Sequence, residues 1–442
     1  MTAPMSHEST DHESPAPWRQ AAPSALPELA AWPSARRAEA LARLDETGLP
    51  HDRLEDWRHT SLEDFSGRWT DYLSRDRAPA APPGEVSRGN NDEPGSIHVH
   101  VVDGEVQTLP VATTATLSIS SLRSLKGALP SGVAELIRKS GAVPPDRLAD
   151  LNTALLSDVV VVSTAADAVI DTPVHLHLEG GEQPMLAQPR VLVDVANGSQ
   201  LTLVIEHTGR AGTLANAVTE GWVGKGGRLT LIRIQALPDD GMLTETTRIE
   251  LAESATAAIT SVDLGGLLAR QTLNVLLAGR DASSTIDGMF LADGRRHIDN
   301  VTSLEHRAPA TTSRENFRGI ADGEWHGVFN GKIIVQPGAA GSSAALTNRN
   351  LLLAKTAEID TKPELEIHVD DVRCSHGATT GQLDANALFY LQSRGLDAAV
   401  ARRVLMTAFL HESLAGITQP ALRSRLEAQL DARLGASAGV SG

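Results

Sequence analysis

The chain has 442 residues, of which 41% are hydrophobic and only 3% aromatic, so it can bury a core lined mainly by small aliphatic side chains. Its formal net charge of -16 disfavours nucleic acid as a partner, because a phosphate backbone would be repelled. With one cysteine, no apolar run of membrane-spanning length and no basic and apolar leader, the sequence predicts a cytoplasmic protein without an internal disulfide, a membrane segment or a thiolate zinc site.

The N-terminal part of the chain divides into a tail and a domain. Residues 1–24 are rich in Ser, His, Glu, Pro and Ala without periodicity, which predicts a disordered tail. Residues 25–155 are expected to form a mostly helical N-terminal domain, with a helix stop at Gly48 and a Pro- and Gly-rich linker near 76–96. Within this domain, IHVHVV at Ile97–Val102 alternates like a strand, and the DG that follows predicts a hairpin.

A repeat runs through the middle of the chain. The segments VDVANGSQLTLV, GWVGKGGRLTLI, IELAESATAAIT and NVLLAGRDASSTIDG each alternate apolar residues on both sides of a small corner residue. The corners Ala196, Gly224, Ala252 and Ala278 are 28, 28 and 26 positions apart. Such a period predicts one β-unit stacked on the next, so residues 156–380 are expected to form a β-solenoid, with an antiparallel sandwich as the alternative.

Helical periodicity returns after residue 380. Asp384 and Asp397 are predicted N-caps, and a stripe of leucines at spacing four follows them. The stripe consists of Leu422, Leu426, Leu430 and Leu434. Residues 381–442 are therefore expected to form a C-terminal helical domain that caps the solenoid or docks a partner. For any single leucine of the stripe, burial in an intramolecular core is the simpler interpretation.

The common motifs of catalysis are missing from the sequence. It holds no G-x-x-x-x-G-K-[ST] phosphate loop and no G-x-S-x-G elbow, and its carboxylates are too scattered to indicate a glycosidase pair. Two H-x-H pairs, His98 with His100 and His175 with His177, could in principle hold a metal ion on strand faces. Exposed histidines on a polar strand face are the preferred interpretation of both pairs.

The single cysteine lies in DDVRCSHGATTG, two positions before a histidine. On an extended strand Cys374 and His376 share one face, while Ser375 points to the other. A thiolate and an imidazole suit iron or zinc, but an iron–sulfur cluster typically takes four protein ligands, which this chain cannot supply alone. From composition alone, a buried cysteine beside a hydrogen-bonded histidine is the stronger interpretation. The alternative is a metal or cluster site that another polypeptide completes.

Residues 311–396 resemble the C-terminal signature of the SufB/SufD family of iron–sulfur cluster assembly proteins. The form VRCSHGATTGQLD followed by FYLQSRG is similar to the SufD branch rather than the SufB branch, and GLPHDRLEDWRHTSL at residues 48–62 resembles the N-terminal motif of the SufD branch. The resemblance implies a helical N-terminal domain, a right-handed parallel β-helix core and a helical C-terminal domain. At His59 this sequence departs from the aromatic residue that the family often has.

The resemblance also implies a non-enzymatic scaffold subunit that works with a SufB-like paralogue and a SufC-like ATPase. The ATPase would dock on helices around residues 384–414. His376, with Cys374 as the adjacent candidate, would help to hold a transient iron–sulfur cluster shared with SufB. An isolated chain could also form a homodimer through the uncovered edge of the β-helix. Two alternatives stay open, namely a β-helix polysaccharide lyase or hydrolase and a self-associating structural solenoid without a metal role.

Overall fold

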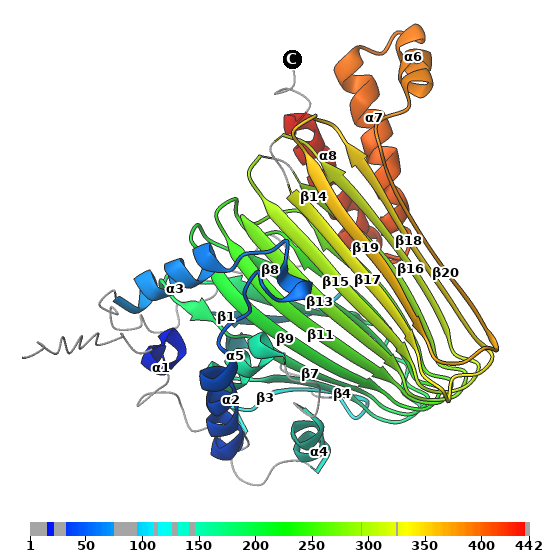
Figure 1. The fold of residues 1–442 in the computed structure, drawn as a ribbon. Helices are drawn as coiled ribbons and strands as arrows, with labels where there is room; N and C mark the ends of the chain where they lie inside the picture. The colour runs from blue at the N-terminus through cyan, green and yellow to red at the C-terminus, as the bar shows by residue number, and fades with distance from the viewer. Residues whose placement is uncertain are drawn as a thin grey trace, which may run out of the picture.

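The computed structural model describes residues 16–21, 32–74, 95–109, 114–125, 131–140, 146–292, 294–323 and 326–437. These residues form two long β-sheets that face each other, with helices on their outer sides (Figure 1). The chain alternates between the two sheets, so each coil gives one strand to each. The parallel β-solenoid that the repeat predicted is confirmed.

The two sheets are named A and B. Sheet A has the order β2 (Glu105–Thr108), β1 (Ile97–Val102), β5 (Val174–Gly180), β8 (Gln200–Gly209), β10 (Arg228–Gln235), β12 (Thr256–Asp263), β14 (Ser283–Ala292), β16 (Thr312–Ala321), β18 (Ser342–Leu352) and β20 (Val372–Gly381). Sheet B has the order β19 (Glu358–Ile367), β17 (His326–Val335), β15 (His297–His306), β13 (Leu268–Leu277), β11 (Met242–Leu251), β9 (Leu214–Val223), β7 (Arg190–Val195), β4 (Val160–Thr164) and β3 (Leu117–Ser121), and β6 (Leu186–Ala187) also pairs with β9. Neighbouring strands are parallel, except that antiparallel β2 and β3 close the sheets at the N-terminal end.

Successive coils stack in register. Leu214 lies opposite Met242, and Met242 lies opposite Leu268, so the column repeats after 28 and then 26 residues. One residue at each corner adopts the left-handed backbone conformation, and its N–H donates to a carbonyl of the next coil. These residues are Gly198, Gly226, Ser254, Asp281, Ala310 and Gly341, with φ between 56° and 76°. The corner pattern of small residues in the sequence therefore marks the tight turns of the solenoid.

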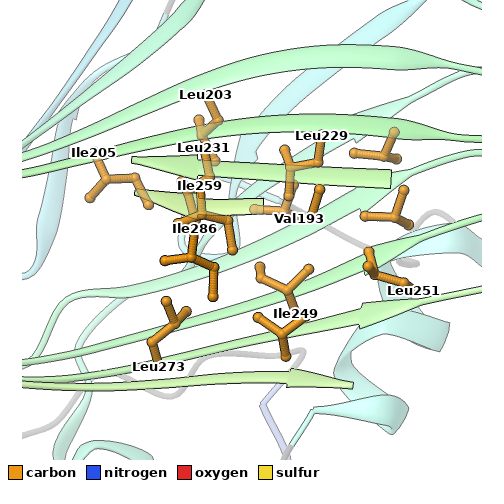
Figure 2. Packing of buried hydrophobic residues seen from close by; sticks show 14 of the residues in the cluster. Val193, Leu203, Ile205, Leu229, Leu231, Ile249, Leu251, Ile259, Leu273 and Ile286 are labelled. Atoms are coloured by element: carbon orange, nitrogen blue, oxygen red, sulfur yellow. The ribbon is translucent and has the colours of Figure 1, made fainter. Parts of the chain in front are cut away.

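Alternate side chains of both sheets fill the interior of the solenoid. Figure 2 shows Leu203, Leu231 and Ile259 of sheet A near Ile249 and Leu273 of sheet B, and each of the five is at most 2% exposed. Similar aliphatic side chains on successive coils pack against one another along the stack. This packing accounts for a core that needs few aromatic residues.

The interior also holds charged groups. Arg233 on β10 donates to Glu245 on β11 at 2.7 Å and pairs with Asp263 on β12. All three side chains are at most 2% exposed. Charged groups in a protein interior are tolerated when oppositely charged groups pair with them. Glu315 on β16 is a different case, because burial raises its pKa to about 7 although the nearby hydroxyl of Thr302 opposes this shift.

Helices cover the outer face of sheet B at the N-terminal side. They are α2 (Ser34–Thr47), η1 (Glu55–Trp57), α3 (Glu63–Ser74), α4 (Ser131–Lys139) and α5 (Arg147–Leu155). Leu44, Trp69 and Leu151 pack against strand residues such as Leu214. The predicted stop is confirmed, since Gly48 follows α2 with a φ of 66°.

The segment EDWRHTSLEDF, residues 55–65, divides into η1 and the start of α3. Thr60, between these helices, lies 2.8 Å from His297 Nε2 and donates to Asp299. These contacts to β15 hold the backbone out of a helical path. A local pattern cannot show them because β15 lies far along the chain.

The tail and the linker are only partly described. Pro17–Ala21 form the short helix α1, and Trp18 donates to Asp45 of α2 at 3.0 Å. The rest of the predicted tail and nearly all of the linker near 76–96 lie outside the described residues. Strands β1 and β2 form the predicted hairpin, which joins sheet A although it falls within the predicted N-terminal domain. The division into domains stays a prediction.

The described C-terminal helices do not cap the last coil as expected but lie on the outer face of sheet A, where their leucines contact several successive strands. They are α6 (Ala385–Ser393), α7 (Ala398–His411), η2 (Glu412–Leu414) and α8 (Pro420–Ser437), and α6 stands clear of the strands (Figure 1). The predicted caps are confirmed, because Asp384 accepts from Asn386 N and Asp397 accepts from Val400 N. All four leucines of the predicted stripe are fully buried against sheet A. Among the described residues, no helix has the length and hydropathy to cross a bilayer.

Replacement of Glu315 by Gln is expected to stabilise the protein at high pH. The carboxyl ionises with a pKa of 4.5 in the unfolded chain but of about 7 in the fold. As the pH rises through this interval, the free energy of unfolding falls by up to about 3 kcal/mol, since one pKa unit corresponds to about 1.4 kcal/mol. Urea unfolding should therefore show that the variant has a much higher free energy of unfolding than the wild type at pH 8. At pH 5 the difference should be much smaller. The exposed Glu358→Gln is the control, and an equal gain at both pH values would contradict the assignment.

Candidate functional site

The predicted site lies on β20, the terminal strand of sheet A. Cys374 lies opposite Ala344 of β18, and His376 lies opposite Leu346. Paired residues of a parallel ladder point to the same side, and both β18 residues belong to the interior core. Cys374 and His376 therefore share the interior face at the end of the solenoid, while Ser375 points outward, as strand alternation predicted.

The two residues differ in exposure. Cys374 is half-buried and packs against the interior core, and burial raises the pKa of its thiol although a hydrogen bond with the backbone of Ala344 opposes this shift. Because the thiolate is the metal ligand, Cys374 is poorly prepared to bind a metal by itself near neutral pH. His376 is exposed. Its imidazole is therefore open to a molecule at this end of the stack.

The described part of the chain brings no third ligand to this pair. Neither residue belongs to a group of three His, Cys, Asp or Glu side chains close enough to share a metal ion. Glu364 and Glu366, which precede them in the sequence, flank the inward-packed Leu365 of β19 and so face outward. Glu364 pairs with Lys362 at 3.0 Å and Glu366 with Lys332 at 2.8 Å. A metal or cluster site at β20 would need ligands from another molecule.

The end of the solenoid beside β20 is apolar and incompletely covered. Leu365, Val369, Val372 and Cys374 contact the interior core, but each remains only partly buried. At the opposite end, where the antiparallel strands β2 and β3 form the edges, Ile97 and Val106 are also partly buried. The partly covered apolar residues beside the edge strands β19 and β20 predict that another protein surface covers this end.

Helix α6 carries two exposed aromatic side chains directly after β20. Phe389 is 72% exposed and Tyr390 is 57% exposed, in a chain with six Phe and two Tyr residues. None of the described side chains of α6 is buried. Both residues lie in the predicted C-terminal helical domain, but neither was among the predicted site residues. The sequence signal for them is two neighbouring aromatic residues with few apolar partners at helical spacing.

Two family descriptions match the chain. The description "SUF system FeS cluster assembly, SufBD core domain" matches residues 177–409, and "SufBD protein N-terminal region" matches residues 28–176. The chain belongs to the SufBD family. The core match contains β20 and α6, so the family region includes both candidate surfaces.

Relatives of this SufBD protein carry consistent names. The iron–sulfur cluster assembly protein SufD of Escherichia coli is 29% identical over 420 residues, which cover 91% of this chain and 93% of that protein. SufBD family proteins of Synechocystis and Mycobacterium leprae are 33% and 30% identical over 63% and 66% of this chain. These matches span 64% and 76% of the two relatives, so the first covers less than two thirds of its relative. The similarity to a protein named SufD extends over nearly the full length.

The N-terminal motif of this SufBD protein fastens the helices to sheet B. His59 Nδ1 lies 2.9 Å from Asp360 Oδ2, and His326 Nε2 lies 2.6 Å from the same oxygen. Thr60 contacts β15 next to this cluster. The motif that resembles the SufD branch thus makes structural contacts between η1 and the last coils.

The expectation that the H-x-H histidines are exposed is wrong for three of the four. His100, His175 and His177 are 6%, 0% and 3% exposed, and His98 is half-buried. Strands β1 and β5 are neighbours, so the two pairs form one cluster on the outer face of sheet A. Burial, together with the neighbouring His175 and His100, lowers the pKa of His177 to about 2.

A large groove of about 1210 Å³ separates the N-terminal helices from sheet B. Among the described residues its lining has ten Lys and Arg and eight Asp and Glu side chains, several of which pair with each other, as Arg43 does with Asp150 and Arg190 with Glu220. A polysaccharide lyase or hydrolase of this fold would be expected to show an acidic cleft along the solenoid. The mixed charges of this groove do not favour that alternative.

Proposed function

We propose that this protein is a SufD-like, non-enzymatic scaffold subunit of a cytoplasmic SufBCD-type complex that assembles iron–sulfur clusters. It would lend His376 to a transient cluster shared with a SufB-like paralogue and would dock a SufC-like ATPase through its C-terminal helices. The observation that carries the proposal is the exposed His376 on the terminal strand of an uncovered solenoid end. Family membership and the near full-length similarity to a protein named SufD support it.

The terminal strand supports an interface with a paralogue. A SufB-like protein of the same fold would have its own terminal strands, and two such ends can pair through backbone hydrogen bonds while they cover each other's apolar residues. His376 would then face ligands of the partner, which this chain lacks among its described residues. We rank His376 above Cys374 as the cluster ligand, because the cysteine is half-buried and its thiol has a raised pKa.

The exposed aromatic residues of α6 support the docking of the ATPase. Aromatic side chains often dominate the binding energy of protein interfaces. The chain passes from β20, which ends at Gly381, to the α6 cap Asp384 within a few residues. A movement of α6 driven by the ATPase would therefore act directly on the strand that carries His376, and it could open the shared site to iron and sulfide.

Replacement of His376 by Ala is expected to reduce cluster assembly without loss of the complex. The protein is reconstituted with its SufB-like and SufC-like partners, and cluster formation is followed by visible absorption and circular dichroism. Loss of a ligand should lower the rate or yield at least about tenfold, and Cys374→Ala should have a smaller effect. Size-exclusion chromatography should show the intact complex in each case.

The control for this experiment is His368→Ala, because His368 is also exposed and lies close to the same end. It should leave cluster formation unchanged. Normal cluster formation by the His376 variant would remove the site assignment but leave the scaffold role standing.

Replacement of Phe389 and Tyr390 by Ser is expected to weaken binding of the SufC-like ATPase by at least about tenfold, since exposed aromatic residues at an interface are each worth about 2 kcal/mol or more. Binding of the SufB-like partner should not change, and isothermal titration calorimetry measures both affinities. Val169→Ser is the control, because Val169 is 57% exposed but lies outside the C-terminal helices. Unchanged ATPase affinity in the double variant would place the docking surface elsewhere.

The homodimer expected for the isolated chain uses the same uncovered end. Light scattering should show a dimer whose mass changes to that of a heteromer when the SufB-like partner is added. A dimer that persists beside the partner would favour the self-associating structural solenoid. Activity of the isolated chain on polysaccharides would instead support the enzymatic alternative.

A further inference from the structure

The four histidines of the H-x-H pairs form one compact cluster far from β20. His98 lies opposite His175 and His100 opposite His177 in the parallel ladder of β1 and β5. The residues between them, such as Leu176, belong to the interior core, so the imidazoles lie on the outer face of sheet A. Their ring centroids are 4.0 to 5.5 Å apart in the pairs that contact each other.

The cluster offers overlapping sets of potential metal ligands. One ring nitrogen from each of His98, His175 and His177 lies within 4.8 Å of the other two. A second set within the same limit combines His100 and His177 with a carboxylate oxygen of Glu179. The first set consists of imidazoles alone. In the second set, His100 Nδ1 and Glu179 Oε1 share a hydrogen bond of 2.9 Å.

A buried carboxylate orients one of the imidazoles. His175 Nε2 lies 3.0 Å from Glu206 Oε2, and Glu206 accepts two hydrogen bonds from Arg425 of α8, at 2.7 and 2.9 Å. A carboxylate paired with Arg425 accepts rather than donates, so the His175 proton is on Nε2 and its lone pair is on Nδ1. Metal-binding histidines are commonly oriented by a carboxylate that accepts a hydrogen bond from the ring nitrogen that does not bind the metal.

The remaining nitrogen of His175 is buried without a hydrogen bond. Its side chain is fully buried, and in the described part of the chain Nδ1 has no hydrogen-bond partner. A buried polar atom that stays unsatisfied is costly, and native structures usually provide it with a partner, a water or an ion. The Nδ1 lone pair of His175 can be satisfied by a metal ion.

We propose that His98, His175 and His177 bind one divalent first-row transition metal ion. Neutral imidazoles suit zinc and its neighbours in this series, whereas calcium and magnesium prefer oxygen ligands. His98 Nδ1 and His177 Nε2 are 2.9 Å apart and share a hydrogen bond. Tetrahedral ligands at about 2.0 to 2.1 Å from zinc are about 3.3 Å apart, so a small rotation of the half-buried His98 brings the two nitrogens to this spacing. The proton of the hydrogen bond then moves to the other nitrogen of its own ring, so that both lone pairs are available to the ion.

The ion would have a structural role that is separate from cluster assembly. It would cross-link β1 to the solenoid strand β5. Strand β1 precedes the helices α4 and α5 in the chain, whereas β5 follows them. Through Glu206 and Arg425 the same site connects to α8. Metal binding at this site would stabilise the packing of the N-terminal strands and of the C-terminal helices against sheet A.

Metal binding to the full chain without an affinity tag tests the proposal. Titration with Zn²⁺ should show one ion per chain, and Co²⁺ should give the intense visible absorption of a tetrahedral site. His98→Ala should lower the affinity by about 100-fold or more, because it removes one of three ligands. His98 is the residue of choice because it is only half-buried and its loss should leave the fold intact; thermal unfolding of the metal-free variant checks this.

Two further variants make the result decisive. His368→Ala, in an exposed histidine outside the cluster, should leave the affinity unchanged. His100→Ala should have a much smaller effect than His98→Ala, because His100 belongs to the second set. Absence of stoichiometric binding, or equal affinity of the wild type and His98→Ala, would overturn the proposal. Loss of binding in His100→Ala alone would reassign the site to the second set.

Discussion

The backbone ladder between successive coils is the constraint on which the rest of the structure depends. Each strand of the solenoid must match its neighbours residue by residue, so every coil has to turn at the same place and present the same face inward. The left-handed corner residues, from Gly198 to Gly341, serve the first requirement. The aliphatic columns around Leu231 serve the second. Arg233 lies in the interior together with its charged partner Glu245, whereas burial raises the pKa of Glu315, which lies there without a charged partner among the described residues.

A stack of this kind has two ends, and the edge strands are antiparallel at one end and parallel at the other. The hairpin strand β2 and the antiparallel strand β3 complete the sheets at the N-terminal end. At the other end the last coil presents a free backbone edge with partly covered apolar residues and an accessible imidazole. The described helices α7, η2 and α8 pack on the outer face of sheet A. The proposed function depends on the accessible imidazole and the partly covered apolar residues at this edge.

Local periodicity accounts for what the sequence could predict. The corner spacing from Ala196 to Ala278 shows the coil length, the leucine stripe beginning at Leu422 shows a buried helix face, and strand alternation places Cys374 and His376 on one side. What could not be predicted depends on partners far along the chain. The break at Thr60 is caused by contacts to β15, and the histidine cluster exists because β1 and β5 are neighbours. The sequence spacing of the two H-x-H pairs carries no information about that pairing.

Because His376 lies on the interior face of β20, the length of this strand is constrained. Turns between coils already differ in length, as the 28- and 26-residue repeats show, so insertions there alter the loops but not the strands. A single residue inserted inside β20 before Cys374 would instead reverse every side chain that follows it. Arg373 would keep its place, while the thiol and the imidazole would exchange faces with their neighbours. Natural variation in this region should therefore be confined to the turns, with the strand itself fixed in length.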